Sequence, residues 1–153
     1  MTSVTISYEE RWRAPVRIWA AALLVALVAA ATLHAGADGI ARAVVPYVLL
    51  VGGTVLALLL SSRGRVRVAD GVLQVPGARI PLDQLGGVRA LDREGTRQLR
   101  GPLAQPQAFV ATRAWLSESV QVQVEDAEDD APYWLIGTRD PEALAAALRA
   151  ADR

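Results

Sequence analysis

Carboxylates and arginines are the side chains in this 153-residue chain best suited to chemistry. The densest carboxylate group is Glu125–Asp130, in which five of six residues are acidic. Clustered carboxylates are ligands for Ca²⁺ or Mg²⁺. However, the spacing is not that of an EF-hand loop, and neither its turn glycine nor its distal glutamate follows. We therefore predict an exposed hairpin turn here rather than a metal site.

A group of arginines is the second feature, and we predict that it binds anionic lipid or a partner: Arg89, Arg93, Arg97 and Arg100. A guanidinium binds phosphate or carboxylate as a two-pronged donor, and basic segments near the inner leaflet attract anionic headgroups. The alternative is that nearby acidic residues, Asp92 and Glu94 among them, neutralise these arginines locally.

Other residue types exclude several kinds of chemistry. Cysteine is absent, so thiolate nucleophiles and disulfides are excluded, and the single histidine, His34, rules out a two-histidine metal site within one chain. The apolar segments described below place His34 across the membrane from the folded domain, so no serine there has a histidine base. Sixteen basic residues, all arginine, balance 16 acidic ones, which gives no reason to expect a nucleic-acid partner. We expect no catalytic residue, no cofactor and no metal. A membrane enzyme that uses carboxylates alone, with Asp126 or Asp129, is the least favoured function.

Two apolar segments dominate the first 62 residues. Residues 18–37 and residues 43–62 each run for 20 positions without a charged side chain. A helix of that length reaches about 30 Å, the thickness of a hydrocarbon core. The short link between them predicts an antiparallel transmembrane hairpin. Gly52 and Gly53 would permit close helix approach, including self-association into a homo-oligomer.

Charge and aromatic residues predict how the hairpin is oriented. Three arginines precede the first segment, three follow the second, and the link carries only Arg42. By the positive-inside rule, both termini are cytoplasmic and the protein is a two-span protein of the plasma (inner) membrane. The predicted membrane-interface anchors are Trp12, Trp19, Arg63, Arg65 and Arg67. A cleaved signal peptide ending at Ala37 is the alternative, which the second apolar segment disfavours.

Residues 63–153 have the pattern of a small, mostly-β cytoplasmic domain. Valines alternate at 66 and 68, Asp70-Gly71 is typical of a hairpin turn, and alternation resumes at Val72. Further strands are predicted at 78–81, 87–91, 108–112, 119–125 and 133–137, whereas the polar stretch 92–107 predicts a long loop. The continuous apolar run 133–137 indicates a strand covered on both faces.

A helix follows the last strand. Asp140 is suited to the N-cap and Pro141 to the first turn, and Leu144 and Leu148 form one apolar stripe. The expected fold class is thus a membrane helical hairpin plus an α+β, mostly-β domain: a bent antiparallel sheet of about seven strands capped by the helix. Residues 1–17 form a cytoplasmic segment in which 3–8 either add an edge strand to this sheet or remain a disordered tail.

The motifs as a set resemble one known family. The chain carries "YEERWRAP", the paired apolar segments, "DREGTRQLRGPLAQPQAFVATRAW" and "PYWLIGTRDPEALAAAL". With these it resembles the actinobacterial membrane-protein family called domain of unknown function 3093, and its last strand and helix resemble the pleckstrin-homology-like fold. The family has no established activity, so the resemblance implies architecture and location only.

The predicted function is therefore a membrane-tethered interaction or scaffold module, not an enzyme. It would bind membrane lipids and a membrane or cytoplasmic protein partner. Sensing of anionic lipid through the arginine group is the alternative, distinguished by salt-sensitive binding to anionic membranes.

Overall fold

The chain forms two compact units, a helical unit and a β unit. The computed structural model describes residues 6–34, 39–125 and 131–151. The helical unit is Arg13–Arg63, and the β unit combines the residues up to Trp12 with those from Gly64 onward. The N-terminal segment therefore does not stand apart, because its strand belongs to the same unit as the C-terminal residues.

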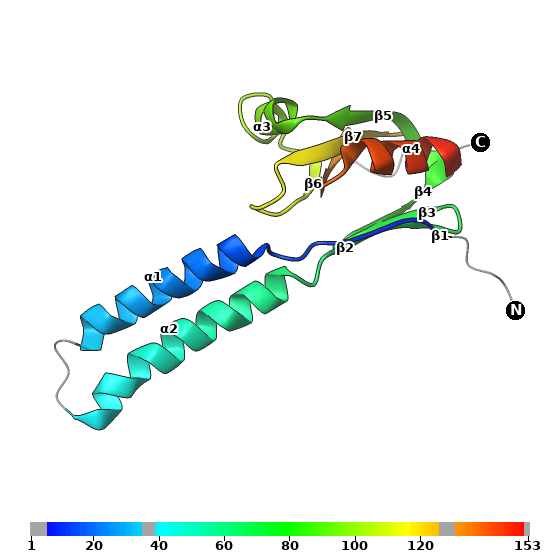
Figure 1. Cartoon of the computed structure of the whole chain (residues 1–153). Coiled ribbons are helices and arrows are strands. Elements are labelled where there is room, and N and C mark those ends of the chain that lie inside the picture. The colour runs from blue at the N-terminus through cyan, green and yellow to red at the C-terminus, as the bar shows by residue number, and fades with distance from the viewer. Residues whose placement is uncertain (1–5, 35–38, 126–130, 152–153) are drawn as a thin grey trace, which may run out of the picture. The chain divides into compact units, whose positions relative to one another are not determined.

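Two helices make up the helical unit, α1 (Val16–His34) and α2 (Ile40–Ser61) (Figure 1). They cover the two predicted apolar segments except for Ser62, which follows the last residue of α2, and for 35–37, which lie outside the described residues. Both helices are long and apolar enough to cross a membrane. Large aliphatic side chains stay on their outer surfaces, with Leu24, Val25 and Leu49 between 63% and 69% exposed.

Small side chains lie where the two helices meet. Ala26 and Ala30, one helical turn apart, are the buried residues of α1, and α2 has no buried residue. Alanines at this spacing let helix backbones approach closely, as in membrane helix pairs. Gly52 and Gly53 are exposed, and a Cβ at either would meet no atom within 4 Å. They therefore do not set the α1–α2 packing.

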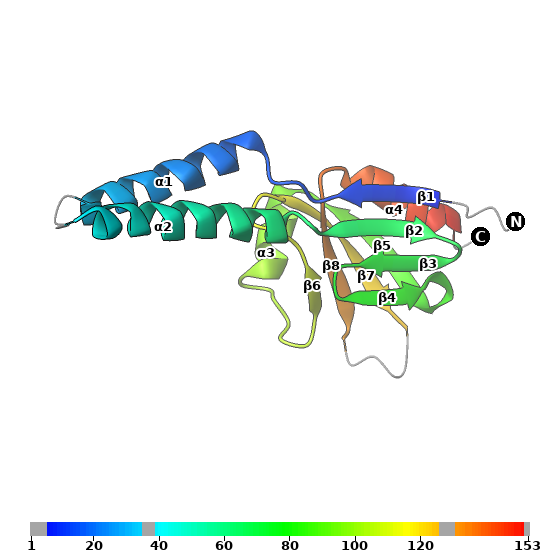
Figure 2. The same cartoon turned by 90° about the horizontal axis from the view of Figure 1, so that it is seen from below.

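Sheet A contains the first four strands in the order β1-β2-β3-β4 (Figure 2). These are β1 (Ile6–Arg11), β2 (Arg65–Ala69), β3 (Val72–Val75) and β4 (Ala78–Pro81). Asp70 and Gly71 both have positive φ, 51° and 73°, as the tight turn between β2 and β3 requires. The strand at the N-terminus runs to Arg11, further than the expected 3–8, and residues 3–5 lie outside the described part.

Sheet B contains the other four strands in the order β5-β7-β8-β6. A 3₁₀ turn (Leu82–Gln84) leads into β5 (Leu85–Leu91), followed by β6 (Phe109–Ala111), β7 (Glu118–Val124) and β8 (Tyr133–Thr138). The pairing of β6 with β8 is parallel. The expectation of one antiparallel sheet of about seven strands was thus wrong in two respects, since the described residues form two sheets of four strands and one pair is parallel.

The main core lies between the two sheets. Val66, Val68 and Leu73 from sheet A meet Val120, Val122 and Ile136 from sheet B, all at most 1% exposed. Strand β8 is buried along its whole length, because Trp134 and Ile136 face this core while Tyr133 and Leu135 join a second cluster on the other face. This double burial explains the continuous apolar run.

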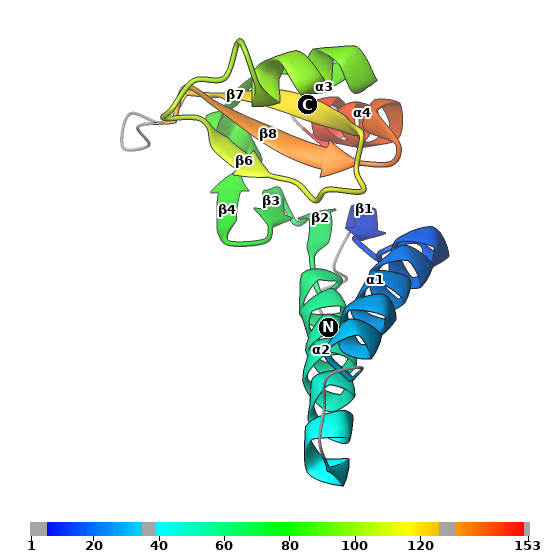
Figure 3. The same ribbon diagram turned by 90° about the vertical axis from the view of Figure 1, so that its left-hand side faces the viewer.

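Helix α4 (Pro141–Ala151) closes the core with Leu144, Ala145 and Leu148, as its apolar stripe predicts. Asp140 caps it, because Oδ1 accepts a hydrogen bond from the amide of Ala143 at 2.9 Å. Helix α3 (Arg93–Arg100) lies on the face of sheet B that points away from sheet A (Figure 3). A long loop was expected over 92–107, and this was wrong for the part that forms α3.

Candidate lipid and partner binding site

The arginines of α3 lie on one face of a helix that is attached by its opposite face. Positions 93, 97 and 100 follow the i, i+4, i+7 spacing of a helical stripe. Thr96 is 2% exposed and shares a hydrogen bond of 2.8 Å with the hydroxyl of Ser119 on β7. Asp92 caps the helix, accepting from the amide of Gly95 at 2.8 Å. The three guanidinium groups are consequently held on the exposed side.

An open depression of about 470 Å³ runs along these arginines. Arg93, Arg97 and Arg100 line it from α3, and Ala114, Leu116 and Ser117 line it from the segment before β7. Ser117 is an exposed residue of this lining. Guanidinium and hydroxyl donors around one hollow are suited to a phosphate or carboxylate.

Only one of the three arginines is neutralised by its neighbours on α3. Arg97 donates to Glu94 at 3.0 Å, and this hydrogen bond holds the pKa of the Glu94 carboxyl below its usual range. Within the described residues, Arg93 and Arg100 have no hydrogen bond or ion pair. Asp92 serves as the helix cap instead. In the described part of the chain, local pairing therefore accounts for Arg97 but not for the other two. Pairing with the acidic group Glu125–Asp130, the rest of this alternative, falls almost entirely outside the described residues.

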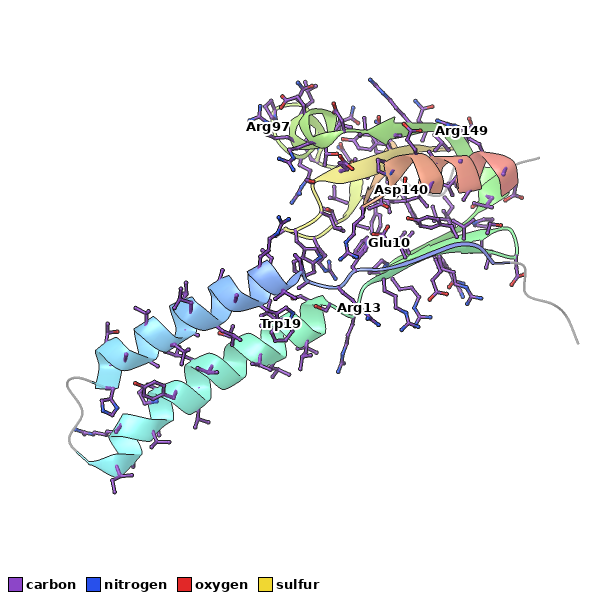
Figure 4. All side chains as sticks on the ribbon, in the orientation of Figure 1. Glu10, Arg13, Trp19, Arg97, Asp140 and Arg149 are labelled. Atoms are coloured by element: carbon purple, nitrogen blue, oxygen red, sulfur yellow. The ribbon has the colours of Figure 1, made fainter. Side chains whose placement is uncertain are left out.

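A second depression, of about 570 Å³, lies at the C-terminal end of α3. It is lined by Arg97, Gln98, Pro102 and Leu103 together with Glu94 and Gly101. Leu103 is 59% exposed. In the described part of the β unit, Val110 is the other large apolar side chain that is exposed. Arg97, labelled in Figure 4, lines both depressions. An apolar residue beside a cation is typical of a protein-binding surface.

Arg89, the fourth predicted arginine, lies elsewhere. It is exposed on β5, opposite Gln121 of β7, and lines neither depression. The structure therefore brings together three of the four predicted residues.

The predicted interface anchors occupy different environments. Trp12 is fully buried in the main core, under the guanidinium of Arg113 at 5.2 Å, so its indole packs against protein rather than headgroups. Trp12 lies two residues after the inward-facing Glu10, and the alternation of β1 continues through it, which explains its burial. Trp19 is half-buried on α1, and Arg63 is exposed at the end of the helical unit. Arg65 and Arg67 belong to β2.

A polar network joins the two sheets where β8 ends, and sequence reasoning did not find it. Glu10 on β1 accepts hydrogen bonds from the hydroxyls of Tyr8 (2.9 Å) and Thr138 and from the amide of Arg139 (3.1 Å). Figure 4 shows Glu10 extending from β1 toward the start of α4, where Asp140 lies. With both carboxylate oxygens engaged, Glu10 fastens β1 to sheet B and is not a free general base.

No group of three potential metal-binding side chains occurs among residues 6–34, 39–125 and 131–151. The acidic group predicted as a hairpin turn falls almost entirely on 126–130, outside the described residues, as do Asp126 and Asp129.

The chain matches the family described as "Protein of unknown function (DUF3093)" over residues 7–148, nearly its whole length. It therefore belongs to this family, and the resemblance drawn from its motifs is confirmed. No curated protein and no solved structure matches the chain.

Proposed function

We propose that the protein is a membrane-anchored interaction module of the inner membrane. Its helical unit is a transmembrane hairpin, and its β unit is a pleckstrin-homology-like cytoplasmic domain that binds a protein partner through the exposed side of α3. The observation that carries the proposal is the outward-facing aliphatic surface of α1 and α2. Of the 16 large exposed apolar side chains among the described residues, 14 belong to these two helices, far more than a water-soluble surface carries.

The pairing of β1 with β2 supports the two-span topology. β1 precedes the hairpin and β2 follows it, yet the two strands pair, with Arg11 opposite Arg65. The amide of Trp12 donates to the carbonyl of Gly64 at 2.9 Å and extends this pairing. The chain enters and leaves the hairpin at a single sheet, so both ends of the hairpin belong on one side of a membrane. The excess of arginine beside these ends favours the cytoplasmic side.

Two sheets closed by a C-terminal helix support the pleckstrin-homology-like part of the proposal. Such a domain offers loops and sheet edges for binding but does not by itself specify a ligand. The apolar Leu103 beside the arginines of α3 favours a protein partner with an acidic and apolar surface. Gly52 and Gly53, which lie open on α2, leave room for a second copy of the hairpin in the bilayer.

Single-cysteine labelling tests the topology cleanly, because the natural chain contains no cysteine. We expect Ala41→Cys, at the start of α2, to react with a membrane-impermeant maleimide on intact cells. Gln123→Cys, exposed on β7, should react only after permeabilisation. Labelling of both positions on intact cells, or release of the protein by alkaline carbonate, would contradict the proposal.

The partner is tested by extraction of the full chain in polymer discs followed by mass spectrometry. We expect one dominant protein, reduced at least tenfold by Leu103→Ser with Arg100→Gln, since removing an apolar anchor and a cation each weakens an interface by about 1–2 kcal/mol. Arg89→Gln, an exposed arginine outside the depressions, is the matched control. Unchanged recovery with the double variant would reject α3 as the partner-binding surface.

Sensing of anionic lipid is the second candidate function, favoured by the unpaired Arg93 and Arg100. It predicts that anionic lipid co-purifies with the full chain and is lost in Arg93→Gln/Arg100→Gln. Retention of the lipid by this variant would exclude α3 as the lipid site.

A further inference from the structure

The outer face of sheet A is strongly basic. In β2, Val66 and Val68 point into the core at 0% and 1% exposure, so the alternating Arg65 and Arg67 point outward. By the same alternation Glu9 and Arg11 lie on the outer face of β1. Ile80 of β4 is buried at 3%, which places Arg79 on the outer face as well.

Strand register arranges these residues in two rows. Glu9, Arg67, Gln74 and Arg79 are successive partners across all four strands. Arg11 and Arg65 are partners in the adjacent row. Like charges directly opposite one another destabilise a sheet unless something lies between them. The second row therefore has an electrostatic cost that an anion would relieve.

Among the described strand residues, this face carries four guanidinium groups and one carboxylate. Glu9 lies 3.5 Å from Nε of Arg11. Arg65 and Arg79 are exposed and have no partner within the described residues, and Nε of Arg67 is buried there without a hydrogen bond. Four positive charges against one negative charge leave a formal excess of three. The chain as a whole is neutral, so this excess is local.

Short stretches of chain join this face to the two helices. Arg65 follows the last residue of α2, Ser61, by four positions, and Arg11 precedes the first residue of α1, Val16, by five. Fully extended chain spans at most about 3.6 Å per residue, so both arginines lie within about 18 Å of a helix end. If the hairpin spans a bilayer, that distance reaches the headgroup layer.

We propose that the outer face of sheet A binds the anionic headgroups of the membrane in which the hairpin is anchored. The arginine rows bind lipid phosphates, and guanidinium forks suit this role better than ammonium groups. This inference rests on the proposed membrane insertion. Since α3 lies on the far side of sheet B, its arginines then point away from the membrane (Figure 3). A docked sheet A therefore presents α3 to a partner in the cytoplasm.

Proximity of a probe to headgroups tests the proposal in the full chain. Gln74→Cys places a fluorophore in the longer arginine row, and Gln98→Cys places one on the exposed side of α3. The protein is inserted into vesicles that carry a nitroxide on their headgroups, made of phosphatidylcholine with or without phosphatidylglycerol. We expect quenching at position 74 in the anionic vesicles, weakened by added salt, and little quenching at position 98.

Two double variants, each of which removes two positive charges, identify the arginines that bind the headgroups. Arg65→Gln/Arg79→Gln, which spares the half-buried Arg67, should lower the ratio of docked to undocked protein by about 25-fold, since each arginine near an anionic surface contributes roughly a fivefold factor. Arg93→Gln/Arg100→Gln should leave quenching at position 74 unchanged. Equal quenching in neutral vesicles, or equal effects of the two double variants, would overturn the proposal.

Three further outcomes separate this inference from the alternatives. A photoreactive group at position 74 that crosslinks to a protein rather than to lipid in native membrane discs would reject the lipid assignment. Carbonate extraction of the protein from vesicles would reject the membrane anchor itself. Retention in the vesicles without quenching at position 74 would reject only the docking of sheet A.

Discussion

Removing the Glu10 carboxylate should destabilise the β unit. Glu10→Ala deletes the acceptor for the hydroxyls of Tyr8 and Thr138 and for the amide of Arg139. Thr138 is 1% exposed, so water does not readily replace the lost partner. Hydrogen bonds to a charged group contribute about 1.5–3 kcal/mol each when buried. For this half-buried carboxylate we take about 1 kcal/mol each, or about 3 kcal/mol together.

Thermal unfolding of the full chain in lipid discs, followed by tryptophan fluorescence, measures this loss. Trp12 and Trp134 are both core residues of the β unit and report its unfolding. A loss of about 3 kcal/mol corresponds to a fall in Tm of about 10–20 °C for a domain of this size. Glu10→Gln, which keeps one acceptor oxygen, should give an intermediate shift.

Glu9→Ala is the matched control, because Glu9 is the next residue on the same strand but points outward. Its 3.5 Å contact with Arg11 is exposed, and such pairs contribute at most about 1 kcal/mol. If Glu10→Ala and Glu9→Ala unfold at the same temperature, the network does not fasten the two sheets and the reasoning fails.

Three further predictions concern single side chains. Burial raises the pKa of Tyr8 to about 12 from 10.0, with the hydrogen bond to Glu10 adding to the rise and one to Thr138 opposing it. Because the folded state retains the proton up to a higher pH than the unfolded state, the free energy of unfolding should be constant below pH 10 and fall by about 1 kcal/mol between pH 10 and 12. The Tyr8→Phe variant should not show this fall. Gly137→Ala would place Cβ 2.5 Å from Thr112 Oγ1 and 3.0 Å from Leu116 Cδ1, so it should lower stability by at least about 1–3 kcal/mol in denaturant titration, and an unchanged midpoint would contradict this packing. Ala30→Leu, at the buried contact of α1 with α2, should reduce disulfide crosslinking between cysteines placed on the two helices, whereas Ala31→Leu on the exposed side should not.

Much of the β unit could be predicted because its strands carry local signals. Alternating valines at 66 and 68 identify β2, the Asp70-Gly71 turn joins β2 to β3, and the run 133–137 reflects burial of β8 on both faces. Helix α4 could be predicted equally well, because its N-cap residue and its apolar stripe are both local features of the sequence. None of these needs information from distant parts of the chain.

Helix α3 could not be predicted from periodicity. It buries one polar residue, Thr96, and packs one apolar residue, Leu99, against sheet B, which is too short a stripe to indicate a helix. The glycine inside it also argues against a helix. At Gly95 a Cβ would lie 3.2 Å from the capping oxygen of Asp92, a tight contact that a larger residue could relieve only if the cap shifted.

The candidate site could be predicted only in part, because its arrangement depends on helix α3. Spacing placed Arg93, Arg97 and Arg100 together once a helix was present, but Arg89 lies on a strand and is directed elsewhere. Whether an arginine pairs with an acidic neighbour depends on the distance between the guanidinium and the carboxylate, and on α3 only Arg97 has such a partner. Trp12 illustrates the same limit, because its flanking position predicted an interface whereas strand alternation buried it.

Local composition by itself determined that the chain has two apolar helices, a set of short strands and a capped C-terminal helix, because each depends on residues within a few positions of one another. Only the tertiary structure decided that β1 pairs with β2 across the whole hairpin, that β6 runs parallel to β8, and that Glu10 meets Thr138. It also decided that the arginines of sheet A and those of α3 lie on opposite sides of the β unit. These arrangements depend on pairings between residues far apart in the sequence, for which local periodicity carries no information.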